Sequence, residues 1–152
     1  MALLPFKKKK QYFTPEQQQQ IVAAIQRAEK NTSGEVRLFV EGKCTYVDPV
    51  DRAREIFFEL KMDKTKDRNA VLLYIAIDDH QLALFADEEI YRRCGTEFWN
   101  AEVKQIIRAF TKDNYTQGIC NCIEEIGDAL KTNFPYESSD KNELPDDIIF
   151  GH

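Results

Sequence analysis

Apolar residues recur along much of the chain at the spacing of amphipathic helices. The first helix is expected to begin at Thr14, where threonine can cap the helix, the following proline suits its first position and Gln17 can complete a capping box. A second helix is expected to open at Asp48. Two more are expected in TEFWNAEVKQIIRAF, capped by Thr96, and from about Tyr115 to Asn133. Each carries one apolar stripe, which predicts that these helices share a hydrophobic core.

Three segments instead follow the pattern of β-strands. Glu35 to Glu41 (EVRLFVE) alternates along its length, whereas Ala70 to Ile77 (AVLLYIAI) is apolar almost throughout, as in a strand covered on both faces. A short turn at Asp78-Asp79-His80 leads into Gln81 to Ala86 (QLALFA), which predicts a hairpin. The helix between the first two strands predicts a right-handed crossover that joins parallel strands. The predicted fold is therefore α/β, with a mixed β-sheet that has one parallel βαβ crossover and a hairpin.

The composition is that of one globular domain. The 152 residues are 43% hydrophobic and 31% charged, which supplies enough apolar material for a core. We expect the domain to cover residues 13–135, with an N-terminal extension at 1–12 and an acidic C-terminal tail at 136–152. Polar, acidic stretches rarely order themselves, so the tail is expected to pack loosely. Its apolar residues predict one docking contact, made by Leu144, Ile148, Ile149 or Phe150.

The charge pattern argues against nucleic acid as a partner, and the short apolar runs argue against a membrane span. The net charge is −5, and the one basic run, Lys7 to Lys10, is short and has the composition of a solvated tail. No apolar run approaches the about 20 residues that a membrane span needs. The opening MALLPFKKKK places its apolar residues before its charges, the reverse of a secretory signal, so the expected location is cytoplasmic. In such a compartment the four cysteines, which form no C-x-x-C pair, are expected to be free structural thiols.

Oxygen-bearing side chains from three distant segments are expected to meet at one edge of the sheet. Parallel strands start at the same edge, and the hairpin returns the end of its second strand to it. Carboxylate and amide oxygens suit a hard cation such as calcium, which is the cofactor this edge predicts. The alternative is a solvated acidic rim, because Asp and Glu beside strand ends often form caps and turns. The candidate metal ligands are Glu35, Asp67, Asn69, Asp87 and Glu88.

The order and content of these segments resemble the TPM domain family. The likeness lies in TSGEVRLFVE at Thr32 to Glu41 and in DRNAVLLYIAIDD at Asp67 to Asp79. It continues through the helix pair TEFWNAEVKQIIRAF and NYTQGICNCIEEIGDAL. The tail DKNELPDDI at Asp140 to Ile148 resembles that of a bacterial, soluble branch of the family. The chain differs at Asn69-Ala70, where the family has Asn-Gly, and at Ala86 to Glu89, where it has a Gly-Asp-x-Gly turn.

The resemblance implies an α/β/α sandwich, with helices on both faces of the sheet. Relatives in this family include a thylakoid lumen protein of photosystem II repair, a plant branch described as an acid phosphatase, and bacterial members that resemble calcium binders. Three functions therefore stay open. The first is a cation-binding domain without catalysis, and the second is a metal-assisted phosphatase in which Arg68 could clamp a phosphate. The third is a protein-interaction module that uses the acidic tail with Phe98 and Trp99. A weaker second cation candidate lies at the opposite edge, with Glu41, Asp78 and Asp79.

Overall fold

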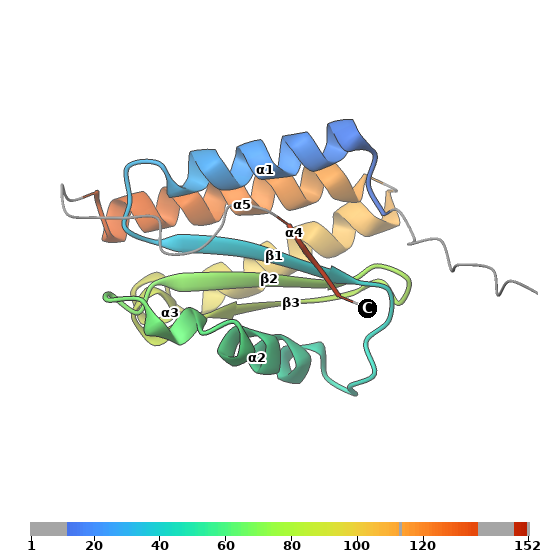
Figure 1. Cartoon of the computed structure of the whole chain (residues 1–152), viewed down its shortest axis with the longest axis horizontal. Helices are drawn as coiled ribbons and strands as arrows, with labels where there is room; N and C mark the ends of the chain where they lie inside the picture. Colours follow the sequence, from blue (N-terminus) through green and yellow to red (C-terminus); the bar gives the residue numbers. More distant parts are fainter. Residues whose placement is uncertain (1–11, 113, 137–147, 152) are drawn as a thin grey trace, which may run out of the picture.

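A mixed sheet with the strand order β3-β2-β1-β4 lies between two layers of helices (Figure 1). The computed structural model describes residues 12–112, 114–136 and 148–151. The central strands β1 (Glu35–Glu41) and β2 (Ala70–Ala76) run parallel, and β3 (Gln81–Ala86) pairs antiparallel with β2. The predicted crossover and hairpin are both confirmed.

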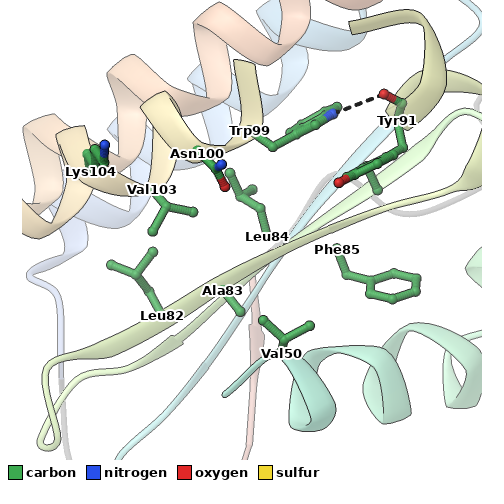
Figure 2. Close-up of a pocket in the computed structure, with 11 residues that line it drawn as sticks. Val50, Leu82, Ala83, Leu84, Phe85, Tyr91, Trp99, Asn100, Val103 and Lys104 are labelled. Carbon is green, nitrogen blue, oxygen red and sulfur yellow. Dashed lines mark hydrogen bonds between the residues drawn. The ribbon is translucent and has the colours of Figure 1, made fainter. Parts of the chain in front are cut away.

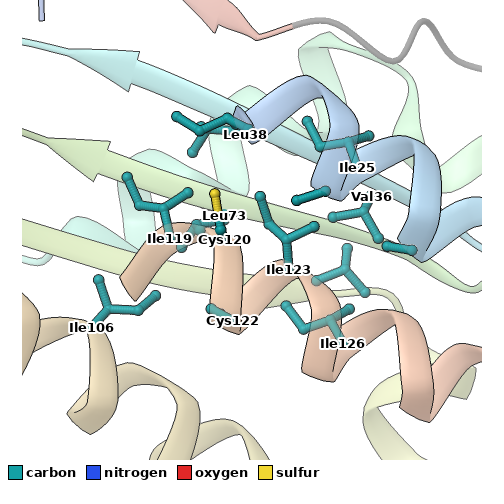
Figure 3. Close-up of a cluster of buried hydrophobic side chains, with 14 of the residues drawn as sticks. Ile25, Val36, Leu38, Leu73, Ile106, Ile119, Cys120, Cys122, Ile123 and Ile126 are labelled. Carbon is teal, nitrogen blue, oxygen red and sulfur yellow. The ribbon is translucent and has the colours of Figure 1, made fainter. Parts of the chain in front are cut away.

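The larger helical layer consists of α1 (Pro15–Glu29), α4 (Thr96–Thr111) and α5 (Tyr115–Asn133). The predicted capping box of Thr14 and Gln17 opens α1, whereas α4 begins after Gly95 without a side-chain cap from Thr96. Figure 3 shows the core that these helices share with β1 and β2. Its labelled members are Ile25, Val36, Leu38, Leu73, Ile106, Ile119, Cys120, Cys122, Ile123 and Ile126.

Helices α1 and α5 approach closely because one residue at their contact has no side chain. A Cβ placed on Gly127 would lie 2.5 Å from the Cα of Ala28 and 3.2 Å from its carbonyl oxygen. Neither helix backbone can yield without opening the layer, so the contact depends on glycine at this position.

The other face of the sheet is covered by α2 (Pro49–Glu59). Asp48 caps this helix, as predicted, by accepting the backbone N–H of Val50. Phe57 of α2 and Tyr74 of β2 belong to the smaller core on this face. The short helices η1 (Met62–Lys64) and α3 (Glu88–Cys94) precede β2 and follow β3, so that they flank the strand ends on which the candidate site lies.

The end of the chain adds a strand that the sequence pattern did not predict. β4 (Ile149–Phe150) lies parallel to β1, with Ile149 opposite Phe39 and Phe150 opposite Val40. Ile148, just before this strand, is buried. The strand pairing and this burial together confirm the expected docking contact of the tail. The other candidate for it, Leu144, lies outside the described residues, as do 1–11 and 137–147.

None of the helices within the described ranges is long and apolar enough to cross a membrane. The cysteines, Cys44, Cys94, Cys120 and Cys122, are free thiols. Burial raises the pKa of the Cys122 thiol well above its usual value, so this group is part of the core rather than a nucleophile.

Candidate functional site

The backbone brings together the three segments that were expected to converge. Glu35 at the start of β1 lies opposite Ala70 at the start of β2, and its N–H donates to the carbonyl of Asn69 at 3.5 Å. The N–H of Asp87, just beyond β3, donates to the carbonyl of Ala70 at 2.9 Å. A further bond joins the N–H of Glu89 to the carbonyl of Arg68 at 3.2 Å. The five predicted ligands therefore lie along one edge of the sheet.

Ser33, Asp67 and Asn69 form the first of two side-chain groups at this edge. The hydroxyl of Ser33 donates to Oδ2 of Asp67 at 3.0 Å, and Nδ2 of Asn69 donates to the same hydroxyl oxygen at 3.0 Å. Asn69 is 1% exposed, and its Oδ1 has no hydrogen-bond partner among the described residues. A buried amide oxygen that lacks a donor is unfavourable, so a positively charged or donating species would be stabilised beside it.

The orientation of the Asn69 amide follows from its neighbour. A carboxylate can only accept, so Ser33 must give its single hydroxyl hydrogen to Asp67. Ser33 can then only accept from Asn69, which places Nδ2 toward the serine and leaves Oδ1 on the other side. The donorless oxygen of Asn69 is thus fixed by a hydrogen-bond chain that ends in a carboxylate.

Arg68, Asp87 and Glu88 form the second group. The guanidinium of Arg68 contacts both carboxylate oxygens of Asp87, with Nε–Oδ2 and Nη2–Oδ1 distances of 2.7 Å, and its Nη1 lies 3.2 Å from Oε1 of Glu88. Asp87 is 4% exposed and also caps α3 by accepting the N–H of Glu88 at 2.8 Å. The hydrogen bond with Asp87 raises the pKa of Arg68, which keeps the guanidinium charged. Two predicted ligands are therefore held by an arginine.

Glu35 is the predicted ligand at the start of β1. It is buried at the first position of β1, and its charge raises the pKa of Arg37, although burial lowers that pKa by more. Within the part of the chain that the structure describes, no three acidic, histidine or cysteine side chains are close enough to hold a metal ion. The predicted ligands share an edge of the sheet, but as placed here they do not form one coordination sphere.

The sequence did not reveal which side chains the guanidinium of Arg68 binds. Arg68 adopts a left-handed backbone conformation, with φ of 51°, which is uncommon for a residue with a side chain. The phosphatase alternative used Arg68 as a phosphate clamp, whereas in the structure the guanidinium is bonded to Asp87 and Glu88. The signal available in the sequence was only the proximity of one arginine to several acids.

At the opposite edge of the sheet, an acidic side chain is likewise paired with an arginine. Glu41 accepts from Nε of Arg52 at 3.0 Å and from Nη2 at 3.2 Å, and also from the hydroxyl of Tyr74. Asp79 accepts the N–H of Cys44 at 2.7 Å. Glu41 and Asp79 thus have structural partners, and this second candidate has less to offer a cation.

Comparison with known proteins identifies the family. The model of the TPM domain matches residues 7–129, most of the chain. The solved NMR structure of the BA42 protein from the psychrophilic bacterium Bizionia argentinensis is similar, with 38% identity and a TM-score of 0.85, over 96% of this chain and 100% of that one.

A second solved structure shares the fold at much lower identity. It is the N-terminal domain of the cg2496 protein from Corynebacterium glutamicum, with 12% identity and a TM-score of 0.64, over 95% of each chain. A search of curated proteins finds no match. The family model and the similarity to BA42 cover the same α/β domain that carries the acidic edge. The chain belongs to the TPM domain family.

Proposed function

We propose that this TPM domain binds a divalent cation, calcium, at the edge of the sheet where β1 and β2 begin. The observation that carries the proposal is the buried Oδ1 of Asn69, which lacks a hydrogen-bond donor among the described residues and lies in the same group as the carboxylate of Asp67. Calcium takes oxygen ligands from carboxylates, amide carbonyls and water, so an orphaned amide oxygen beside a carboxylate suits it.

The charges at this edge support the same choice. Asp67, Asp87 and Glu88 bring three negative charges, and Arg68 is the cation bonded to two of them. A divalent cation would neutralise more of this charge than one guanidinium does, and it would relieve the repulsion between neighbouring carboxylates. Oxygen ligands rather than nitrogen or sulfur favour calcium or magnesium over zinc.

Arg68 has to move for the site to reach a full coordination shell. Its side chain is 36% exposed, so it can swing into solvent and release Asp87, which is 4% exposed and fixed by its role as the cap of α3. In this scheme Asp67 and Asn69 bind first, and Asp87 becomes a ligand as Arg68 leaves. The work of breaking the Arg68 pair weakens binding, so we expect a dissociation constant on the order of 10⁻⁵ to 10⁻³ M.

The test is thermal unfolding with rising calcium on the wild type and on Asp67→Asn. Binding to the folded state alone stabilises it by about 2.7 kcal/mol at a hundredfold excess over the dissociation constant, so the melting temperature should rise by several degrees. Asp67→Asn removes one ligand charge at a partly exposed position and should abolish most of this shift. Asp51→Asn is the matched control, because Asp51 is exposed on the first turn of α2 and has the same side chain.

Amide and side-chain NMR locates the ion. Calcium should shift the Nδ2 protons of Asn69 and the backbone amides of Asp67 to Ala70, and magnesium should act more weakly, because its smaller shell demands stricter geometry. A wild type that shows no calcium-dependent shift in melting temperature contradicts the proposal. An equal shift in Asp67→Asn would place the ion elsewhere, and assays of a phosphate ester with and without calcium separate binding from catalysis.

A further inference from the structure

β3 is one of the two edges of the sheet that the described strands form. In the strand order β3-β2-β1-β4 it has a strand neighbour on one side only. Its ladder with β2 fixes which of its backbone groups point outward. Because the N–H of Asp87 donates to the carbonyl of Ala70, the alternation of an antiparallel ladder turns the N–H and C=O groups of Leu82, Leu84 and Ala86 away from β2. No other described segment forms a backbone bond with these groups.

This edge lies at the bottom of a groove of about 490 Å³. Figure 2 shows its two walls. Val103 and Trp99 of α4 lie on one side of the strand, and Val50 of α2 lies on the other. The side chains of β3 divide in the same way, with Leu82 and Leu84 toward α4 and Phe85 toward α2. An added strand would therefore find an apolar surface above and below it.

Exposed apolar side chains also lie on the helices near β3. One of them, Tyr91, stacks on Trp99 with ring centroids 6.3 Å apart. Another, Phe58, lies 6.1 Å from Phe85 of β3 between ring centroids. Exposed apolar side chains beside a free strand edge indicate a binding surface. The exposed apolar residues on these helices are Val50 and Phe58 of α2, Tyr91 of α3 and Ile107 of α4, of which Val50 and Tyr91 line the groove.

The free backbone groups of β3 favour an extended segment as the occupant, because a strand that pairs with them satisfies both their donors and their acceptors. Lys104 is the one charged residue among the side chains that line the groove, and it is exposed on the α4 wall, close to Val103.

We propose that β3 binds an extended peptide segment of a partner protein by strand addition. The segment pairs with the outward backbone groups of Leu82, Leu84 and Ala86, and it carries alternating apolar side chains and an acidic residue that meets Lys104. Backbone bonds supply register and affinity, and the two apolar walls select side chains on both faces of the added strand. This surface is separate from the edge where β1 and β2 begin, so the proposal does not depend on cation binding.

The experiment uses a synthetic peptide, Ac-Thr-Val-Thr-Val-Thr-Glu-NH2, titrated into the full chain. Trp99 is the only tryptophan and lines the groove, so its fluorescence reports binding. NMR should show the largest amide shifts at Leu82, Leu84 and Ala86, and slower hydrogen exchange there. A second peptide carries N-methyl groups on alternate backbone nitrogens, which removes donors and keeps every side chain. Its affinity should fall at least about tenfold, because each lost bond is worth about 0.5–1.5 kcal/mol.

A charge swap tests the role of Lys104. Lys104→Glu changes an exposed side chain and should weaken the acidic peptide about threefold to fivefold, as expected for an exposed ion pair. The same variant should bind a peptide with lysine in place of glutamate more tightly than the wild type does. Lys30→Glu, at the exposed C-cap of α1, is the matched control and should leave both affinities unchanged. The proposal is overturned if the acidic peptide shows no binding to the wild type at a peptide concentration of about 2 mM, because specific contacts usually bind more tightly than that. It is also overturned if the N-methylated peptide binds as tightly as the unmethylated acidic peptide. A dimer of this chain joined through β3, detected by sedimentation, would overturn it as well.

Discussion

The guanidinium of Arg68 and the carboxylate of Asp87 form a two-point pair, with both nitrogen–oxygen distances at 2.7 Å. The pair joins the loop before β2 to the cap of α3, so it stabilises the edge in the absence of a cation. The same pair occupies a carboxylate that the proposed calcium site would use. If the proposed site binds calcium, Arg68 therefore competes with the ion for Asp87.

Replacing Arg68 with glutamine should change stability and calcium response in opposite directions. Without calcium, Arg68→Gln leaves the buried carboxylate of Asp87 without its charged partner, and the free energy of unfolding should fall by about 1–3 kcal/mol. Calcium affinity should rise about tenfold, because no guanidinium has to be displaced. Isothermal titration and thermal unfolding measure both effects. Arg92→Gln, at an exposed arginine that pairs with Glu89, is the control and should show neither. Unchanged calcium affinity in Arg68→Gln would exclude Asp87 as a ligand.

Glu102 predicts a pH dependence of stability. This carboxyl group is buried beside Cys122 and Glu125, and burial, followed by its hydrogen bond with Glu125, raises its pKa to about 8. The folded protein therefore holds a proton that the unfolded chain releases near pH 4.5. Stability should be greatest below that pH, fall between about pH 5 and 8, and level off above it, with a slope of at most about 1.4 kcal/mol per pH unit.

Glu102→Gln should remove this component while keeping a group that can donate to Glu125. Denaturant unfolding at a series of pH values compares the variant with the wild type. Glu97→Gln is the matched control, because Glu97 is exposed on the same helix. If Glu102→Gln loses stability with pH as steeply as the wild type, the carboxyl group is ionised in the folded protein and the assignment is wrong.

Gly127→Ala should destabilise the domain although alanine favours helices. The added Cβ would meet the backbone of Ala28 at 2.5 Å, so α1 and α5 would have to move apart. We expect a net loss of about 1–2 kcal/mol, after the gain in helix propensity is subtracted. Asp128→Ala, at the exposed neighbouring position of α5, should change stability by less than about 0.5 kcal/mol. An equally small effect at Gly127 would show that the helix pair can adjust.

Removing residues 148–152 should lower the melting temperature. The deletion eliminates β4, buried Ile148 and the bond from the N–H of Gly151 to the carbonyl of Val40 at 2.7 Å. It also uncovers the edge of β1. A loss of about 1–3 kcal/mol is expected, which corresponds to several degrees for a domain of this size. An unchanged melting temperature would mean that β4 contributes no stability.

The sequence allowed the central sheet to be predicted because its strands carry strong local patterns. The apolar run from Ala70 and the capped helix before it leave few arrangements for the strand–helix–strand unit. β4 could not be predicted as a strand, since two residues carry no periodic pattern and their pairing depends on a contact across the whole chain.

The same distinction applies to the candidate site, whose backbone placement could be predicted from the sequence and whose side-chain partners could not. Topology alone brings Glu35, Asp67 and Asp87 to one edge, because strand ends follow from strand directions. Side-chain geometry decides that Arg68 binds Asp87, and that Ser33 turns the amide of Asn69. Residue types and spacing contain no information on such choices between nearby partners. The groove beside β3 likewise depends on how far α2 and α4 stand from the strand, which no local pattern specifies.

The pairing of β1 with β4 has a consequence for synthesis on the ribosome. β1 is made early, but the strand beside Phe39 and Val40 comes from Ile149 and Phe150, which follow every other described helix and strand in the chain. During translation the apolar edge of β1 therefore stays uncovered until α5 has formed and these residues have emerged. Nascent chains that stall or end before Ile149 would expose that edge, so they should be the forms of this protein most dependent on chaperones.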